Sequence, residues 1–336
     1  MKVTVSLVTY NHAPFIRQAI ESVLSQKTDF DFELLIGEDD STDGTREIVR
    51  EYAAKYPENI RVIYNERKNV IYYRGKPTGR YNLVTNLRNA TGQYVALLEG
   101  DDYWADPQKL QKQVDHLDRH PEQSCCFHDV LVLEDKTGVT RSYPIKVRQA
   151  EYSLKEFIEG HAAPHTSSIF FRNGLIGEFP DWFYCLAFAD KPLLVLLGER
   201  GTIGFLPEVM SVYRVHQGGI LHGGSTGFWR WSNKVAIERV SSELEYYETI
   251  RQYLRSEYRK VIDCKIAGLN YELVWLFQRQ NNYRLMRKHL LRAFQTRNFE
   301  VDFSLGHIFR SSLIAFFPLI YRIYLWVRNK PTAPIK

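Results

Sequence analysis

Several common sequence features are missing from this chain of 336 residues. No stretch of 18 uncharged apolar residues occurs, so no membrane-spanning helix is predicted. Neither GxxxxGKS nor GxGxxG is present, which leaves phosphate binding by a glycine-rich P-loop unsupported. Cysteine is scarce, and no two cysteines form a C-x-x-C pair or show the spacing of metal ligands: Cys125, Cys126, Cys185 and Cys264. We interpret all four as reduced thiols in a cytosolic protein.

The length allows a sizeable core, in one large domain or in two. The amino-terminal segment MKVTVSLVTYNH turns polar after about eight residues, which is too short for the apolar region of a signal peptide. We therefore expect a cytoplasmic protein.

Charge is distributed unevenly along the chain. Residues 1–225 hold 25 Lys and Arg against 30 Asp and Glu, whereas residues 226–336 hold 19 against 9. This asymmetry indicates two regions with different partners, unless the basic region is only a solvated helical surface.

Strand patterns alternate with helix patterns over the first hundred residues. We expect strands over 3–9, 32–40, 60–66 and 93–102, and helices over 14–26, 41–57 and 78–92. Such alternation builds a parallel sheet with helices on its faces.

The second part of the chain changes in character. Further strands are expected over 124–135, 167–172 and 202–216, a helix over 189–201, and a glycine-rich loop over 218–227 that is either a lid or a linker. Long amphipathic helical patterns then occupy 234–262 and 269–295, so we place a domain boundary near residue 225.

Acidic residues follow two of the expected strands. The first run is GEDD and the second is LLEGDDYW, and both fall at the carboxyl ends of strands, where open α/β sheets bind ligands. Two or three carboxylates fixed there suit a hard cation such as Mg²⁺ or Mn²⁺, which also binds phosphate oxygens. A DD pair alone is a weak motif, and a solvated loop is the alternative.

The order of three segments resembles the nucleotide-sugar half of the family-2 inverting glycosyltransferases. The segments are VSLVTYNHAPFIRQAIESVLSQ, ELLIGEDDSTDGT and ATGQYVALLEGDDYW. The resemblance covers about residues 3–220 and implies the GT-A fold, an α/β domain with a Rossmann-like, mostly parallel sheet and helices on both faces. We expect this catalytic domain over 1–225 and a basic helical region over 226–336.

The resemblance implies a nucleotide pocket at the first two strand ends. Thr9, Tyr10 and Asn11 would line the pocket for the base and the ribose. Glu38 and Asp39 match the two acids of the family pattern, and Asp39 would hydrogen-bond the uracil edge. Asp40 departs from the pattern, which usually has Gly or Asn there.

The resemblance also implies a metal site. Asp102 would coordinate Mg²⁺ or Mn²⁺, and Asp101 would contact the ribose or a metal-bound water. Glu99 stands at the first acid of the D-x-D region. Arg214 and His216 match the family's Y-R-V-H strand end, where His216 can ligate the metal and Arg214 can contact diphosphate.

An inverting transfer needs a base opposite the leaving diphosphate. Asp190, in ADKPLLVLL, matches the family's acid at a helix start, and its alternative role is that of a helix N-cap. His165 and Thr166 match the segment that lines the acceptor side, or belong to a polar loop before a core strand. Trp104 either offers a sugar ring an apolar face or belongs to the core.

Residues 307–330 are apolar and aromatic with basic residues around them. We expect them to lie on the anionic inner face of the cell membrane or to pack on protein. The expected partners are a nucleotide sugar, most simply UDP-linked, and a glycan or lipid-linked acceptor. Nucleic acid is not expected, and homo-oligomerisation stays open.

The sequence thus predicts a metal-dependent glycosyltransferase of polysaccharide biosynthesis. One alternative is a catalytically silent nucleotide- or sugar-binding subunit. Another is a sugar-1-phosphate nucleotidyltransferase, although YNHAPF is not the glycine-rich, basic loop expected after the first strand of such an enzyme.

Overall fold

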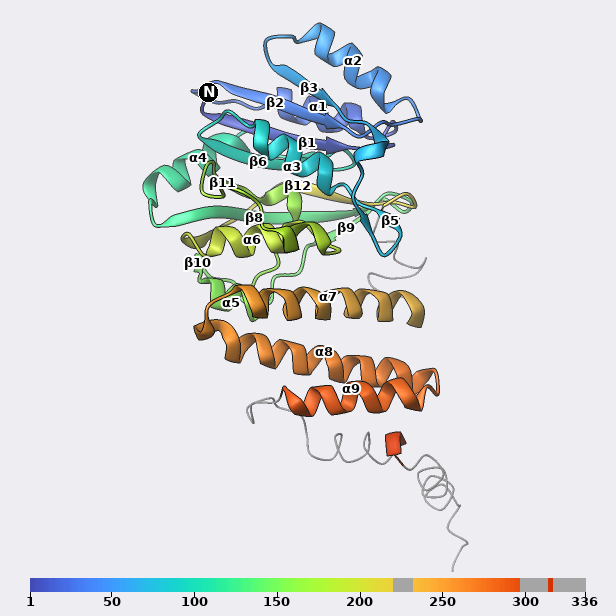
Figure 1. Cartoon of the computed structure of the whole chain (residues 1–336). Coiled ribbons are helices and arrows are strands. Elements are labelled where there is room, and N and C mark those ends of the chain that lie inside the picture. Colours follow the sequence, from blue (N-terminus) through green and yellow to red (C-terminus); the bar gives the residue numbers. More distant parts are fainter. Residues whose placement is uncertain (220–231, 297–313, 317–336) are drawn as a thin grey trace, which may run out of the picture. The chain divides into compact units, whose positions relative to one another are not determined.

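The computed structural model describes residues 1–219, 232–296 and 314–316 (Figure 1). The chain divides into two compact units, Met1–His222 and Gly223–Lys336. The predicted boundary near residue 225 lies outside the described residues, as do most of the glycine-rich loop 218–227 and most of segment 307–330.

Ten strands of the described chain form one sheet in the first unit. Its main path runs β10-β12-β8-β11-β6-β1-β2-β3, while β7 pairs with β12 and β9 with β8. The bounds are β1 Val3–Thr9, β2 Phe32–Glu38, β3 Ile60–Tyr64, β6 Tyr94–Glu99, β7 Tyr103–Trp104, β8 Gln123–Glu134, β9 Val139–Ser142, β10 Glu151–Tyr152, β11 Phe170–Arg172 and β12 Thr202–Val215. A separate hairpin joins β4 Tyr72–Tyr73 to β5 Lys76–Pro77.

The sheet is mostly parallel, as predicted. The strands β3, β2, β1 and β6 run parallel to one another, and β8 runs parallel to β12. The short strand β11 lies between β6 and β8 and is antiparallel to both. Parallel neighbours need long crossover connections, which the intervening helices supply.

Helices cover both faces of the parallel half of the sheet (Figure 1). Val3, Val5 and Leu7 of β1 have no exposed surface and share a hydrophobic core with side chains of α1, α2 and α4. Ser6 points to the other face and accepts a hydrogen bond from Asn86 of α3. The helices of this unit are α1 Ile16–Leu24, α2 Thr45–Lys55, α3 Arg80–Asn89, α4 Lys109–Arg119, α5 Leu154–Ile158 and α6 Asp190–Gly198.

The second unit contains three described long helices where the sequence predicted two helical stretches. They are α7 Asn233–Tyr253, α8 Arg259–Arg279 and α9 Tyr283–Gln295. The first break comes at Leu254 and Arg255, whose backbones are extended. The second comes at Asn281, whose φ of 56° ends α8, and Asn282 then caps α9.

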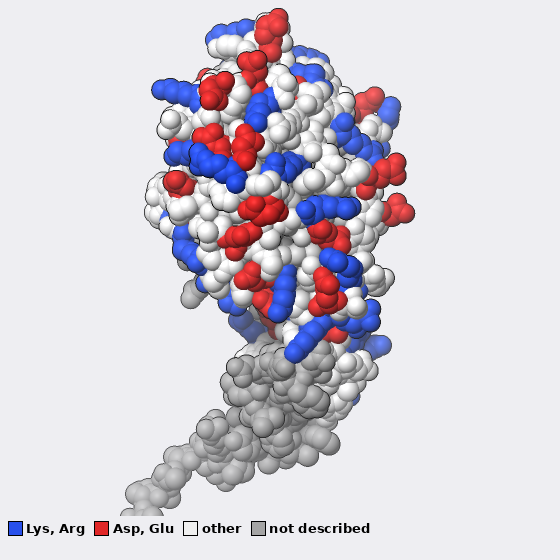
Figure 2. All heavy atoms as spheres, turned by 90° about the vertical axis from the view of Figure 1, so that its left-hand side faces the viewer, with Lys and Arg blue, Asp and Glu red and all other residues white. Residues whose placement is uncertain are grey.

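None of the helices in the described ranges is both long and apolar enough to cross a bilayer. On the face drawn in Figure 2, acidic and basic side chains are interspersed over the described atoms. Acidic and basic residues therefore do not separate into two zones on this face, although the first part of the sequence is acidic and the second part is basic.

Candidate active site

Three parallel strands end side by side at the carboxyl edge of the sheet. Thr9 of β1 pairs with Glu38 of β2, and Val8 of β1 pairs with Glu99 of β6. The two acidic runs therefore meet at one edge, which is the ligand-binding edge of open α/β sheets.

Glu99, Asp101 and Asp102 form a carboxylate cluster directly after β6. One oxygen from each lies within 4.8 Å of the others. Asp102 is 2% exposed, and its Oδ1 accepts a hydrogen bond from the Arg214 amide at 2.9 Å. Its Oδ2 has no hydrogen-bond partner among the described residues and lies 3.8 Å from His165 Nδ1. An unpartnered buried carboxylate oxygen is costly, which indicates that it serves a ligand.

Burial and mutual repulsion shift the pKa values of these acids. Burial, together with the charges of Asp101 and Glu99, raises the pKa of Asp102 well above its usual range. Burial, together with the charges of Asp101 and Asp190, raises the pKa of Glu99 to about 8. A divalent cation would relieve this repulsion, so the oxygen-rich cluster fits Mg²⁺ or Mn²⁺.

Two histidines flank Asp101. Its Oδ2 lies 3.1 Å from His216 Nε2 and 3.7 Å from His12 Nε2. Burial raises the pKa of Asp101, but the hydrogen bond from His216 and the electrostatic effect of the two nearby histidines outweigh burial and leave the pKa lowered. His216 Nδ1 accepts from the Gly218 amide at 3.2 Å, so Nε2 carries the proton that it donates to Asp101. His12 was not among the site residues predicted from the sequence.

The turn after β6 approaches β1 closely at Gly100. A Cβ on Gly100 would lie 2.6 Å from Thr9 Oγ1 and 2.9 Å from His12 Nδ1. Both of these buried polar atoms lack a hydrogen-bond partner in the part of the chain that is described. Glycine at this position therefore lets the acidic turn pack directly against the end of β1.

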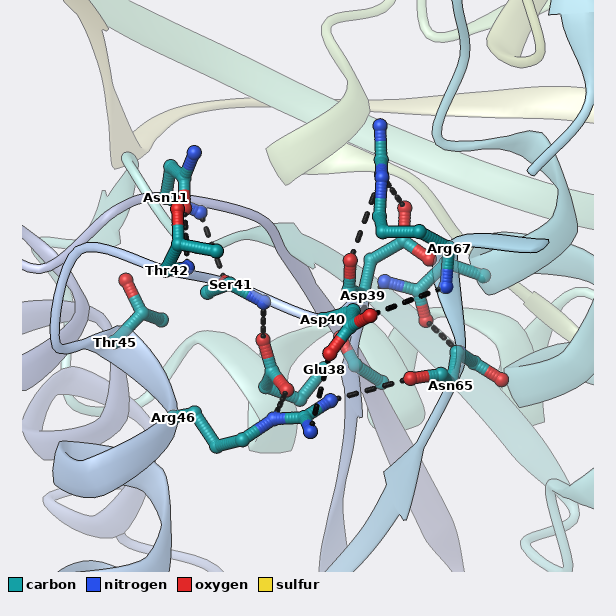
Figure 3. Close-up of polar contacts among 12 residues, drawn as sticks. Asn11, Glu38, Asp39, Asp40, Ser41, Thr42, Thr45, Arg46, Asn65 and Arg67 are labelled. Atoms are coloured by element: carbon teal, nitrogen blue, oxygen red, sulfur yellow. Dashed lines mark hydrogen bonds and ion pairs between the residues drawn. The ribbon is translucent and has the colours of Figure 1, made fainter. Parts of the chain in front are cut away.

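The loops after β1 and β2 are tied to each other (Figure 3). The Asn11 amide donates to Ser41 Oγ, and the Thr42 amide donates to Asn11 Oδ1, each at 2.9 Å. Asn11 and Asp40 have positive φ values of 53° and 63°. Asn and Asp adopt this conformation more easily than other non-glycine residues, which explains how Asp40 replaces the Gly or Asn of the family pattern.

Arg46 of α2 balances two of the acids after β2 (Figure 3). It forms an ion pair with the fully buried Glu38 and a second with Asp40 at 3.2 Å. Glu38 also accepts a hydrogen bond from the Ser41 amide at 2.7 Å. Both carboxylate oxygens of Glu38 are thus bonded to protein, and its predicted contact with the nucleotide stays a prediction.

Asp39 keeps one oxygen free for a ligand. Its Oδ2 pairs with Arg67 Nη1 at 2.8 Å, while its buried Oδ1 has no hydrogen-bond partner within the described ranges. Burial raises the pKa of Asp39 to about 6. The Arg67 guanidinium also lies 4.0 Å from the centroid of the half-exposed Tyr10 ring. Arg67 was missed from the sequence because it stands in a short 3₁₀ turn with no motif around it.

Asp190 is the first residue of α6 and is half-buried. The N-cap residue is Ala189, and no side-chain cap bond closes this helix end, so the alternative role of Asp190 as an N-cap is not found. The charge of Asp190 acts on both Glu99 and Arg80. Asp190 therefore lies within electrostatic reach of the carboxylate cluster.

The side chains of Arg214 and Trp104 are both held by contacts within the protein. Arg214 donates to the Asp101 carbonyl and Asp135 Oδ1, each at 3.0 Å, and to Gln18 Oε1 at 2.6 Å. The predicted contact of Arg214 with diphosphate stays a prediction. Trp104 is 4% exposed and belongs to the hydrophobic core, which favours the core alternative over a sugar platform.

His165 lies beside the acids, on the turn before β11. Burial lowers the pKa of His165 to about 4, so the ring is neutral. Its Nδ1 forms a hydrogen bond with Ser167 Oγ at 2.9 Å, and the centroid of its ring lies 4.3 Å from the centroid of the Tyr213 ring. Thr166 follows it and is half-buried. Their assignment to the acceptor side stays a prediction.

Comparison with known proteins gives several matches. The family model described as "Glycosyl transferase family 2" matches residues 4–177. "Uncharacterized protein Rv1520" of Mycobacterium tuberculosis is 35% identical over 231 residues, which are 66% of this chain and 62% of that protein. "Uncharacterized glycosyltransferase MG025" of Mycoplasma genitalium is 30% identical over 238 residues, 69% of this chain and 72% of that protein. The chain thus spans less than two thirds of the length of Rv1520.

Two solved structures share the fold. The mannosyltransferase PcManGT from Pyrobaculum calidifontis, in complex with GDP-Man and Mn²⁺, matches with a TM-score of 0.54 and 20% identity, over 97% of this chain and 84% of that one. S. aureus TarS 1–349 in complex with UDP-GlcNAc matches with a TM-score of 0.50 and 18% identity, over 94% and 79%. The predicted GT-A fold is confirmed by these likenesses together with the strand order. Since the family model covers more than half of its residues, the chain belongs to glycosyl transferase family 2.

Proposed function

We propose that this protein is an inverting, metal-dependent glycosyltransferase that moves a sugar from a UDP-sugar to a hydroxyl group. The observation that supports this most directly is the unpartnered Oδ2 of the buried Asp102, within a three-carboxylate cluster at the ligand-binding edge. Family membership supports the nucleotide-sugar donor.

The groups around Asp39 can hydrogen-bond the edge of uracil. Its free Oδ1 accepts a hydrogen bond from an N–H group, and Arg67 beside it is a donor for a carbonyl oxygen. The N3–H and a neighbouring carbonyl of uracil offer this pair. The half-exposed Tyr10 and the neighbouring Thr9 and Asn11 complete the base and ribose pocket.

Asp102 would hold Mg²⁺ or Mn²⁺, with Asp101 and Glu99 beside it. His216 would join as a ligand through Nε2 once that nitrogen gives up its proton and its hydrogen bond to Asp101. The cation, when bound, supplies positive charge that stabilises the leaving diphosphate. Asp101 and His216 already contact each other, so the chain orients these two side chains before the donor arrives.

Asp190 acts as the base. As the acceptor oxygen bonds to the sugar C1, the bond from C1 to the diphosphate breaks, and the hydroxyl proton passes to the Asp190 carboxylate. Attack opposite the leaving group inverts the anomeric centre. His165, Thr166 and the side chains around them would line the acceptor side.

The acceptor is a growing glycan or a lipid-linked glycan. The basic composition of residues 226–336 supports association with an anionic membrane surface, where such acceptors lie. The aromatic and basic segment 307–330 would provide the contact.

Calorimetric titration with UDP, with and without Mn²⁺, tests the site. We expect metal-dependent UDP binding by the wild type and by the control variant Asp115→Asn, whose partly exposed carboxylate lies on α4. Asp102→Ala and Asp102→Asn should weaken this binding by about 10-fold or more, since each removes a charged ligand. Equal binding by all four proteins would contradict the metal assignment.

Turnover of a panel of UDP- and GDP-sugars then decides between an enzyme and its alternatives. An inverted glycoside product supports the proposal. Metal-dependent nucleotide binding without any transfer or hydrolysis would instead identify the catalytically silent subunit.

A further inference from the structure

We propose that Arg80 of α3 is a positioning residue for Asp190, because it fixes the backbone of the loop that leads into α6. This inference rests on the proposed function, in which Asp190 is the base. Arg80 lies 110 positions before Asp190 in the sequence, and no motif connects the two.

Arg80 reaches this loop from inside the protein. It is 2% exposed, and its two terminal nitrogens donate to the carbonyl oxygens of Phe183 and Phe188. Its guanidinium also lies 5.3 Å from the centroid of the Phe183 ring. Phe183 belongs to a 3₁₀ turn, Asp181–Cys185, and Phe188 stands two residues before Asp190.

The loop has little regular structure of its own. From residue 186 to 189 the backbone is neither helical nor extended in a strand. The buried Phe183 and Leu186 side chains anchor its first part. The bond from Arg80 to the Phe188 carbonyl holds the last part, immediately before α6 begins.

The helix that carries Arg80 is itself fixed to the sheet. Asn86 Nδ2 donates to the carbonyl oxygens of Leu7 and Leu35 at 3.1 and 3.2 Å, and Asn82 Nδ2 donates to the Gly37 carbonyl at 2.8 Å. Arg80 therefore connects Asp190 to the strands β1 and β2, whose ends form the nucleotide pocket.

The charge of Arg80 also favours an acid at this position. Its hydrogen-bond acceptors are neutral carbonyl groups, and a buried cation without an anionic partner is unfavourable. Burial lowers the pKa of Arg80 to about 10, while the charge of Asp190 acts in the opposite direction. Arg80 stays cationic at neutral pH, and an acidic residue at position 190 favours this charge.

An arginine suits this role better than a lysine. The planar guanidinium presents several N–H groups in a fixed fork, so it holds two carbonyl groups at once, whereas an ammonium group is a compact point charge. Arg80→Lys therefore keeps the charge and loses the paired geometry. Arg88→Lys is the matched control, because Arg88 is exposed on the same helix, and its hydrogen bond goes to the Tyr184 side-chain hydroxyl and not to a backbone carbonyl of the loop.

Steady-state kinetics of Arg80→Lys, alone and combined with Asp190→Asn, test the proposal. We expect Arg80→Lys to lower kcat by about 10- to 100-fold through misplacement of Asp190, with metal-dependent UDP affinity unchanged. In the Asp190→Asn background the same substitution should change kcat by less than about twofold, because residues that act as a unit are not additive. Arg88→Lys should match the wild type in both backgrounds.

Chymotrypsin digestion provides a second readout that does not need turnover. Chymotrypsin should cleave Arg80→Lys faster than the wild type after Phe188 or Tyr184. The melting temperature of the variant should stay close to that of the wild type, which shows that the loosening is confined to the loop. If cleavage and kcat both match those of the wild type, the proposal is wrong.

Two kinetic outcomes separate this proposal from the proposed function. Multiplicative losses in the double variant would assign Arg80 a general structural role and overturn the positioning proposal alone. Full activity of Asp190→Asn would overturn the base assignment and the positioning proposal together.

Discussion

Lys109 stands at the start of α4 with no exposed surface, which is rare for lysine. Its Nζ donates to Gln113 Oε1 at 2.6 Å and lies 4.0 Å from the centroid of the Trp104 ring. Burial lowers the pKa of Lys109 from its ordinary value of 10.5 to about 7. Gln113 in turn donates to the Ser168 carbonyl at 3.0 Å, on the turn that carries His165.

This shift makes stability depend on pH in a defined direction. Between about pH 7 and pH 10 the folded protein has released a proton that the unfolded chain still holds, so the contribution of Lys109 to stability rises with pH. In Lys109→Met this contribution is absent. The free energy of unfolding of the variant minus that of the wild type should therefore fall by about 1.4 kcal/mol per pH unit across this range.

Urea unfolding at several pH values measures the slope. Lys112→Met is the control, because Lys112 lies on the same helix and is partly exposed. The free energy of unfolding of this variant should change with pH with the same slope as that of the wild type, within error. A constant difference between Lys109→Met and the wild type would show that Lys109 is charged in the folded protein over the whole range.

Single residues were predictable from sequence where they stand in a motif at a strand end. Asp39, Asp101 and Asp102 follow strands that the apolar pattern identifies, so their meeting at one edge follows from the alternation of elements. Arg67 and Arg80 were not predictable, because their partners are a side chain and carbonyl groups brought near only by the fold.

Among the elements, α3 contacts the sheet through buried polar side chains in addition to its buried Leu83 and Val84. The Asn86 amide reaches β1 and β2 together, and a Cβ on Gly37 would lie 1.9 Å from Asn82 Oδ1. This close approach leaves no room for a side chain at Gly37. The apolar periodicity used to predict helices cannot reveal such a contact.

Replacing Asn86 should loosen this junction. In Asn86→Leu the hydrogen bonds to the Leu7 and Leu35 carbonyls are lost, and we expect the free energy of unfolding to fall by about 2–4 kcal/mol. Urea unfolding measures the loss. Asn89→Leu is the control, because the Asn89 side chain is exposed and donates to the Thr85 carbonyl of its own helix. Equal losses for the two variants would mean that Asn86 does not hold α3 to the sheet.

The arrangement of the later strands was less predictable than that of the first four. A strand over 167–172 was expected, but its residues 167 and 168 lie in a 3₁₀ turn, Thr166–Ser168, and β11 keeps only three residues. Its place between β6 and β8, antiparallel to both, depends on pairings far apart in sequence. The breaks between α7, α8 and α9 depend on single backbone conformations, which helical periodicity does not show.

At the scale of the whole molecule, the candidate site and the main core belong to the first unit. The buried cluster that includes Val3 and Met210 draws only on residues of this unit. The site residues from Thr9 to His216 lie in it as well. The division into a catalytic domain over 1–225 and a helical region over 226–336 is therefore our proposal for how the function is partitioned.

A fragment of residues 1–219 should fold and bind UDP. We expect a cooperative thermal transition by circular dichroism, since a domain of this size buries enough apolar surface to fold alone. Its metal-dependent UDP affinity should equal that of the full chain within about threefold, because all the site residues proposed in the described part of the chain lie at or before His216. The fragment carrying Asp102→Ala is the negative control, and an unfolded fragment would contradict this partition.

The position of β11 also has a consequence for synthesis on the ribosome. The parallel strands β1, β2, β3 and β6 are complete once residue 99 has emerged, but the strand that covers the free edge of β6 begins only at Phe170. At roughly 5–20 residues per second, this interval lasts about 4–14 seconds. During this time the nascent chain presents an apolar strand edge that other chains can pair with. Translation speed between these two strands, and the chaperones that bind there, should therefore influence how much of the protein reaches its native form.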